Sequence, residues 1–192
     1  MPRTATQNKE IRTDRRAKIL DAALNVFAEE GYHSASISKV SKYAGVSKGL
    51  MYNYFESKEE LLHELLHEVM FKEIKIMELL SKDDFSDQSL VNLIHQTFDI
   101  LAEDPKHWKL YFVMSLQPEV RAVMMNDYAE IINEFSAKFI AYFQDKYGEK
   151  YETEWHFFNT MMGGMKLSFI MDPDNYPIDR MKKKLINQFI TT

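Results

Sequence analysis

Apolar residues recur at helical spacing along nearly the whole chain, and this pattern limits the fold more than any other feature. Near the start, Ile19, Ala23 and Phe27 stand four residues apart, so they would share one helix face. Alternating runs of Val, Ile and Thr, which are typical of strands, are absent from the sequence. Only 6 Gly and 5 Pro interrupt 192 residues. The sequence therefore predicts an all-α fold.

Capping and turn residues divide this pattern into about nine helices. Gly31 is placed to end the first helix, and Ser36 and Ser47 are placed to cap two short ones. Ser57 and Glu60 have the spacing of a capping box, in which each side chain would bond the other residue's backbone. The expected helices are 10–30, one after Ser36, one after Ser47, 57–81, 87–103, 105–115, 118–146, 151–171 and 178–190.

Charge is distributed unevenly along the chain, although the net charge is only -5. Residues 1–58 carry ten Lys and Arg against six Asp and Glu, whereas the remainder carries fourteen against twenty-three. A basic end beside an acidic remainder indicates that the first part approaches a polyanion such as nucleic acid, unless the split is accidental drift in surface charge. We expect two domains, 1–56 and 57–192, joined by a long helix.

Two absences in the sequence restrict the location. There is no Cys, so neither a disulfide framework nor a thiolate metal site can form. The start, MPRTATQNKEIRTDRR, is polar and basic, and no run approaches the roughly 18 apolar residues of a membrane span. We expect a cytoplasmic protein without a membrane partner.

The segment after Ser36 has the spacing of a helix-turn-helix. Ile37, Val40 and Ala44 would share one face of a short helix, and Gly45 permits a tight turn. Preceded by a bracing helix, this unit can place its second helix in the major groove of DNA.

Polar groups occupy the outer face of that second helix. Lys48 offers a cation to a phosphate or a guanine edge, and Gly49 lets the backbone come close. The hydroxyls of Tyr52 and Tyr54 can bond phosphate oxygens, and Asn53 can bond a base edge. Met51 and Phe55 would point inward. The alternative is a helical hairpin whose tyrosines merely cap a core.

These residues carry a family resemblance. The segment from Arg15 to Leu62 closely resembles the N-terminal DNA-binding domain of the TetR family of bacterial transcriptional regulators, in the turn Gly45-Val46-Ser47, the pair Tyr52 and Phe55, and the run Lys58-Glu59-Glu60-Leu61. The resemblance implies a variable C-terminal domain that binds a small ligand and dimerises. It also implies DNA contacts by Ser36, Ser38, Ser47, Lys48, Gly49, Leu50, Tyr52, Asn53, Tyr54 and Lys58.

Three positions depart from the family pattern. Leu50 stands where the family often has a small hydroxyl residue; it can touch a thymine methyl but cannot donate a hydrogen bond. Ser41 and Tyr43 replace residues that are usually small and apolar. These departures affect the expected operator sequence more than the expected function.

The helix 151–171 is apolar on two faces. Trp155, Phe158, Met162, Met165 and Phe169 follow one stripe, and Phe157, Met161, Gly164 and Met171 follow another. Such a helix must be covered on both sides, either by its own chain or by a partner subunit. We expect a homodimer built from the last two helices, with Phe157, Met161, Gly164, Met181, Leu185 and Phe189 at the interface.

Met and aromatic residues are dense after residue 98, and such side chains line irregular apolar cavities as well as filling cores. We expect a small, largely apolar or aromatic effector to bind at Trp108, Tyr111, Phe112, Phe158, Met162 and Met165.

No catalytic function is expected from the sequence. No Ser-His-Asp order, phosphate loop or metal-ligand cluster is present, and His63 and His67, four apart beside Glu64 and Glu68, suit a solvated surface better than a metal. We expect neither a cofactor nor a metal. The predicted function is a ligand-responsive regulator, a repressor that binds a pseudo-palindromic operator in double-stranded DNA as a homodimer. The alternative is an all-α ligand-binding or interaction module without DNA binding.

Overall fold

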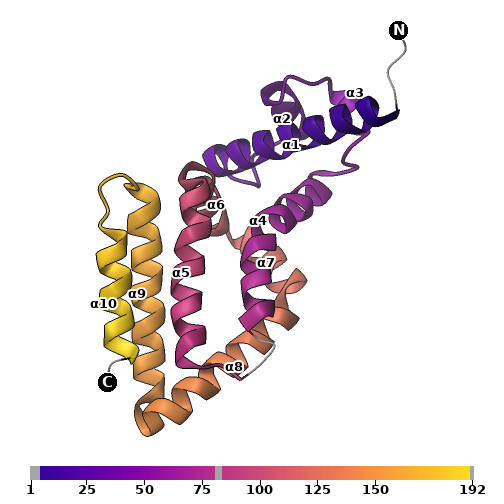
Figure 1. Cartoon of the computed structure of the whole chain (residues 1–192). Coiled ribbons are helices and arrows are strands. Elements are labelled where there is room, and N and C mark those ends of the chain that lie inside the picture. The colour runs from indigo at the N-terminus through magenta and orange to yellow at the C-terminus, as the bar shows by residue number, and fades with distance from the viewer. Residues whose placement is uncertain (1–4, 81–83, 191–192) are drawn as a thin grey trace. The chain divides into compact units, whose positions relative to one another are not determined.

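A computed structural model describes residues 5–80 and 84–190, and these residues contain helices and no strand (Figure 1). The predicted all-α fold is therefore confirmed. No helix of the described residues is long and apolar enough to cross a membrane. The helices are α1 (Ala5–Glu30), α2 (Ile37–Tyr43), α3 (Lys48–Met51), α4 (Lys58–Leu80), α5 (Asp87–Glu103), α6 (Pro105–Ser115), α7 (Pro118–Asp127), α8 (Ala129–Tyr147), the 3-10 turn η1 (Gly148–Lys150), α9 (Tyr151–Met171) and α10 (Ile178–Ile190).

The described chain forms two compact units. The N-terminal unit comprises the residues up to 69 and residues 110–126, and the C-terminal unit comprises 70–109 and the residues from 127 onward. Helices α4 and α6 each contribute residues to both units. This division by packing differs from the predicted division by function at residue 56, which stays a prediction.

Most helix boundaries agree with the sequence, and two differ. Helix α1 begins at Ala5 instead of residue 10. The expected helix 118–146 is divided into α7 and α8 at Tyr128, whose φ of -119° and ψ of 11° leave the helical region. Asn126 and Asp127 precede this break, and both residue types compete with the helix by bonding nearby backbone. Residue 81, the expected end of the fourth helix, lies outside the described residues.

The N-terminal unit is built around the buried face of α1. Ile19, Ala23 and Phe27 are each 0% exposed, as their spacing predicts. Helix α2 packs against α1 and α3 against α2. At the start of α4, the Ser57 hydroxyl accepts the backbone N–H of Glu60 at 3.0 Å, as predicted. The Glu60 carboxylate accepts the N–H of Glu56 instead of that of Ser57, so the expected capping box is only half formed.

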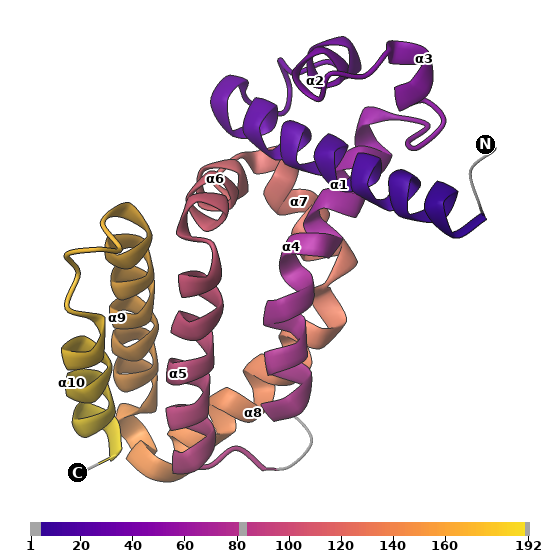
Figure 2. The ribbon, with the colours of Figure 1, turned by 45° about the horizontal axis from the view of Figure 1, so that its top comes forward.

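The core of the C-terminal unit is an aromatic cluster centred on Phe143 of α8, which is 0% exposed. Its ring lies 5.1 Å from Phe139, 5.9 Å from Phe158 and 6.0 Å from Phe189, measured between centroids. These rings come from α8, α9 and α10, and most pairs meet edge to face or tilted, as the ring quadrupoles favour. Helices α5, α9 and α10 lie side by side in both ribbon views (Figures 1 and 2).

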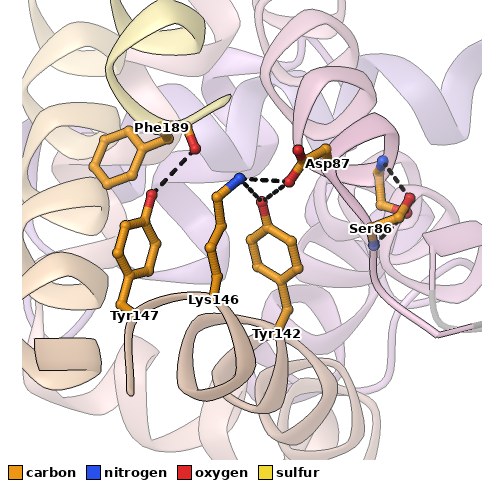
Figure 3. A network of polar contacts seen from close by, with 7 residues as sticks. Ser86, Asp87, Tyr142, Lys146, Tyr147 and Phe189 are labelled. Atoms are coloured by element: carbon orange, nitrogen blue, oxygen red, sulfur yellow. Dashed lines mark hydrogen bonds and ion pairs between the residues drawn. The ribbon is translucent and has the colours of Figure 1, made fainter. Parts of the chain in front are cut away.

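A polar network fastens the start of α5 to the end of α8 (Figure 3). The Asp87 carboxylate accepts hydrogen bonds from the Tyr142 hydroxyl at 2.5 Å and the Lys146 ammonium at 2.6 Å. Asp87 is also the first residue of α5, where the helix dipole favours a negative charge. Beside it, the Tyr147 hydroxyl donates to the carbonyl of Phe189 at 3.1 Å.

These contacts shift the pKa values of Asp87 and Tyr142 in opposite directions. The hydrogen bond from Lys146, followed by that from Tyr142, lowers the pKa of Asp87. Burial, followed by the hydrogen bond to Asp87, raises the pKa of Tyr142. The network therefore holds a charged carboxylate and a neutral phenol together at neutral pH.

We expect Asp87→Asn to lower the free energy of unfolding at pH 7 and to lose this effect in acid. Because the folded pKa of Asp87 is depressed, its contribution is complete above the unfolded value of about 3.9 and disappears as the pH falls through the folded value. Denaturant unfolding at a series of pH values measures the gap between variant and wild type. Asp145→Asn on α8 is the matched control, and a gap that stays constant into strong acid contradicts the assignment.

Candidate nucleic-acid interface and ligand cavity

The helix-turn-helix is formed as predicted by α2, a four-residue turn and α3. Gly45 takes a φ of 68°, a left-handed conformation that glycine adopts without strain. The turn is closed by the N–H of Val46, which donates to the carbonyl of Ser41 at 3.0 Å. The hydroxyls of Ser36 and Ser47 cap α2 and α3 by accepting the N–H groups of Lys39 and Leu50.

Helix α3 is too short to include all of the predicted DNA-contact residues. It ends at Met51, and residues 52–54 continue as a tight turn in which Asn53 N–H bonds the carbonyl of Leu50 at 3.1 Å. Met51 and Phe55 are 0% and 1% exposed, so both point inward as predicted. They anchor the turn between them.

The predicted contact residues gather on the outside of this segment. Lys48, Gly49, Tyr52 and Asn53 are exposed, as are Ser36, Ser38 and Ser47. Leu50 and Tyr54 are half-buried, and the Arg12 guanidinium lies 5.9 Å from the centre of the Tyr54 ring. Arg12 lies outside the predicted contact set. Its pairing with Tyr54 spans 42 positions of sequence, so no local pattern indicates it.

Lys58 has a different environment from the other predicted contacts. Its ammonium donates to the carbonyls of Tyr32, His33 and Ala35 at 2.9, 3.2 and 3.2 Å, and it lies 4.4 Å from the centre of the Tyr32 ring. An ammonium has three donors, and these carbonyls accept all of them. The structure therefore favours Lys58 as a brace of the loop between α1 and α2, and its phosphate contact stays a prediction that this geometry does not favour.

Gln117, between α6 and α7, holds the same loop within the N-terminal unit. Its side chain accepts the N–H of Tyr32 at 2.5 Å and donates to the carbonyl of Phe27 at 2.9 Å. Burial, followed by the charge of Glu59, raises the pKa of Tyr32 to about 12, so this phenol stays neutral. Sequence reasoning missed Gln117 because its partners are 85 and 90 positions away.

The two departures in α2 have separate explanations. Ser41 is 4% exposed, and its hydroxyl donates to the carbonyl of Ser38 at 3.0 Å, so the buried polar group is satisfied. Tyr43 is 54% exposed and takes no part in the core.

A cavity of about 260 Å³ lies inside the C-terminal unit. Four helices form its walls. Its lining consists of Glu73, Ile76 and Met77 of α4, Leu93, Thr97 and Ile100 of α5, Ile132, Phe135, Ser136 and Phe139 of α8, and Trp155, Phe158, Asn159, Met162 and Lys166 of α9. A mainly apolar lining with a few polar groups is typical of small-molecule sites.

The structure brings together only part of the predicted ligand set. Phe158 and Met162 line the cavity. Trp108 is not among the lining residues, and its indole N–H donates to the carbonyl of Ile100 at 2.9 Å. Tyr111 and Phe112 belong to the N-terminal unit. Met165 instead lines a separate hollow of about 70 Å³ between α9 and α10. The six residues do not line one cavity.

The missed lining residues come mainly from α5 and α8. Ile132, Phe135 and Phe139 follow helical spacing, as do Leu93 and Ile100. The signal was present in the sequence, but the same periodicity marks a filled core and an open cavity.

The predicted dimer residues divide into two groups. Phe157 is 44% exposed and Gly164 is exposed, whereas Met161 and Met181 are half-buried. Leu185 and Phe189 are 3% and 1% exposed within a single chain, so their predicted place at the dimer interface stays a prediction that this burial does not favour. They are core residues because α9 and the aromatic cluster cover them.

No group of three or more His, Asp or Glu in the described part of the chain could hold a metal ion.

The fold and the outward polar groups define a class of protein: a helix-turn-helix DNA-binding unit combined with an all-helical unit that contains a cavity. Residues 19–65 match the profile of the family described as bacterial regulatory proteins, tetR family. The chain is therefore similar to the TetR family over this segment.

Individual relatives agree with this family. The chain is 41% identical over 88 residues to the fatty acid metabolism regulator protein of Bacillus subtilis, a match that covers 45% of each protein. It is 29% identical over 134 residues to the transcriptional regulator UidR of Escherichia coli K12, covering 64% of this chain and 63% of UidR. The matched stretches thus span less than two thirds of these curated relatives.

A solved structure extends the likeness in fold. FadR of Bacillus subtilis, in complex with stearoyl-CoA, has a TM-score of 0.65 and 24% identity, covering 91% of this chain and 97% of FadR. At this identity the likeness shows the fold.

We expect Lys58→Met to destabilise the protein while leaving the salt dependence of DNA binding unchanged. Three backbone carbonyls would lose a charged donor, which costs about 1–3 kcal/mol. Denaturant unfolding and DNA titrations at several salt concentrations measure the two effects. Lys48→Met is the matched control: it should keep stability and reduce the salt slope by about 0.9 for each lost phosphate contact. A reduced slope for Lys58→Met would show that Lys58 contacts a phosphate.

Proposed function

We propose that the protein is a ligand-responsive transcriptional regulator, a repressor that binds operator DNA as a homodimer in the cytoplasm. The observation that carries this proposal is the outer face of α3 and its following turn, where Lys48, Tyr52 and Asn53 are exposed while Met51 and Phe55 are buried. These exposed groups have the chemistry of DNA contacts.

The contacts divide into two kinds. Lys48 and the hydroxyl of Tyr52 suit phosphate oxygens, which fix position along the duplex. Asn53 suits a base edge, since its amide can donate and accept at once, and Leu50 suits a thymine methyl. Gly49 adds no side chain, and a Cβ placed there would meet nothing of the protein within 4 Å. The duplex can therefore approach the backbone closely at this point.

The ligand half of the proposal rests on the cavity between α4, α5, α8 and α9. Its apolar lining suits a small, largely apolar or aromatic effector. FadR, which shares the fold, was solved with stearoyl-CoA, so an acyl compound is one candidate to test on this chain.

Helix α4 supplies the link between effector and DNA. It begins at Lys58, directly after the helix-turn-helix, and its residues Ile76 and Met77 line the cavity. An effector that binds one arrangement of α4 more tightly than another shifts the balance between them. In a homodimer this changes the spacing of two recognition segments that must match major grooves about 34–36 Å apart.

The homodimer is proposed from an uncovered apolar face of α9. Phe157 and Met171 are 44% and 56% exposed, so the described chain does not cover this stripe as it covers Phe158 and Phe169. Gly164 lies on the same face and would let a second helix approach closely. A two-fold pairing of identical faces would bury this stripe.

We expect the double variant Lys48→Ala, Tyr52→Ala to bind its operator at least about tenfold more weakly, because two phosphate contacts are lost in each half-site. Fluorescence anisotropy with the DNA that flanks its own gene measures the affinity. The control variant Lys106→Ala, Lys150→Ala removes two exposed cations from the C-terminal unit. Equal operator affinity for both variants and the wild type refutes the contact assignment. Binding without sequence preference or salt dependence refutes the function.

We expect Gly164→Glu to convert the dimer into monomers and to weaken operator binding. A Cβ at Gly164 meets nothing within 4 Å in the chain, and Glu favours helix over Gly, so the fold should persist. The new carboxylate would be buried against its two-fold mate. Sedimentation velocity measures the mass, with Ala137→Glu on the exposed side of α8 as control. A dimer that survives Gly164→Glu places the interface elsewhere.

A further inference from the structure

Arg12 of α1 carries a positive charge beside the helix-turn-helix that no carboxylate neutralises. The side chain is exposed, and its guanidinium lies 5.9 Å from the centre of the Tyr54 ring. None of the ion pairs among the described residues includes Arg12. Glu10 and Asp14 stand two positions away on α1, so they do not share its helix face. The charge of Arg12 is therefore available to an anion from outside the chain.

The next arginine on the same face of α1 has a different environment. Arg16 follows four residues after Arg12, and its guanidinium lies 5.6 Å from the centre of the Phe55 ring. The charge of Arg16 is paired with the Glu64 carboxylate of α4. The two arginines thus lie beside neighbouring rings of one segment, and only Arg16 has an acidic partner. Arg16 joins α1 to α4, whereas the ring contact of Arg12 leaves its N–H donors for a further acceptor.

The Tyr54 ring places this cation at the edge of the candidate DNA-binding surface. Tyr54 is half-buried, directly follows the exposed Asn53, and donates its backbone N–H to the carbonyl of Met51 at 2.9 Å. Met51 is 0% exposed, so the turn that carries the ring is anchored in the core. An aromatic ring attracts a cation that lies within about 6 Å of its centre. This attraction restricts the long Arg12 side chain while its charge stays exposed.

A phosphate of the DNA backbone suits this arrangement better than a base edge. A helix-turn-helix places its second helix in the major groove, so a cation at the edge of that helix meets the backbone that borders the groove. Arg12 belongs to α1, outside the two helices of the motif. The planar guanidinium matches phosphate geometry, since two of its N–H groups can donate to two oxygens at once.

We propose that Arg12 binds a phosphate of the DNA backbone and that the Tyr54 ring holds its guanidinium in position for this contact. The proposal deepens the proposed function and rests on it. Phosphates carry no sequence information, so Arg12 contributes to affinity and to the position of the protein on the duplex, and not to the choice of bases. The Tyr54 ring then has a role in addition to the phosphate contact predicted for its hydroxyl.

Arg12→Gln tests the contact on two duplexes, one from the DNA that flanks the protein's own gene and one of shuffled sequence. We expect both to bind about tenfold more weakly with their affinity ratio unchanged, and the salt slope to fall by about 0.9 for each half-site. Fluorescence anisotropy at several salt concentrations measures these quantities. Arg121→Gln, which removes an exposed arginine from α7 of the same unit, is the matched control and should leave affinity and slope unchanged.

The role of the ring is tested by repeating Arg12→Gln in two backgrounds. In Tyr54→Phe the ring remains, so Arg12→Gln should again weaken binding about tenfold. In Tyr54→Leu the ring is absent, so the same change should weaken binding only about two- to threefold, because the two residues act together. Denaturant unfolding without DNA checks each variant, and Tyr54→Met replaces Tyr54→Leu if the latter does not fold. A purely structural role of Arg12 would lower the unfolding midpoint and leave the salt slope unchanged.

Three results would overturn parts of this proposal. An effect of Arg12→Gln no larger than that of Arg121→Gln removes the phosphate contact, and a changed preference between the two duplexes shows that Arg12 reads a base instead. An equal cost of Arg12→Gln in the Tyr54→Phe and Tyr54→Leu backgrounds removes the role of the ring. If the wild type binds DNA with a salt slope while these results appear, only this inference fails; if the wild type binds neither duplex, the proposed function fails.

Discussion

The candidate DNA-binding surface depends on holding two helices that are too short to be stable alone. Helix α2 has 7 residues and α3 has 4, whereas isolated helices below about 12–15 residues are marginal in water. Their stability must come from the packing of α2 against α1 and of α3 against α2, and from end caps. Met51 and Phe55 supply the packing, and Ser36 and Ser47 supply the caps. Because the inner face and the caps stabilise the segment, Lys48, Tyr52 and Asn53 on the outer face are not needed for its packing.

A second set of contacts fixes the loop that feeds these short helices. Lys58 binds three carbonyls of the loop from one side, and Gln117 binds Tyr32 and Phe27 from another. Both contacts are made to backbone, so they set the path of the chain without depending on the loop's own side chains. Lys58 is also the first residue of α4. The first residue of α4 is therefore joined to the loop by a charged contact as well as through the peptide chain.

Local features of the sequence predicted the local features of the structure. The caps, the glycine turn, the inward pair and most helix ends follow from chemistry within four residues of each position. What the sequence could not show is contact between distant positions. Gln117 is one example, and Lys58 is another, because a cation next to a helix-turn-helix suggests phosphate when only the sequence is read. The break at Tyr128 was missed for a different reason. Asn126 and Asp127 lower the stability of a helix but do not indicate the residue at which it ends.

The spacing of apolar residues does not distinguish residues that line a cavity from residues that fill a core. Phe158 and Phe135 are buried core residues that also line the cavity, whereas the predicted Trp108 does not line it, and its indole N–H donates to the carbonyl of Ile100. Periodicity reports which face of a helix is apolar and not what that face meets. Helix α9 makes this concrete, since one face meets the cavity at Met162, one meets the core at Phe169, and one is exposed at Met171. A helix with more than one apolar face therefore serves three surroundings at once, and the spacing of its apolar residues does not distinguish them.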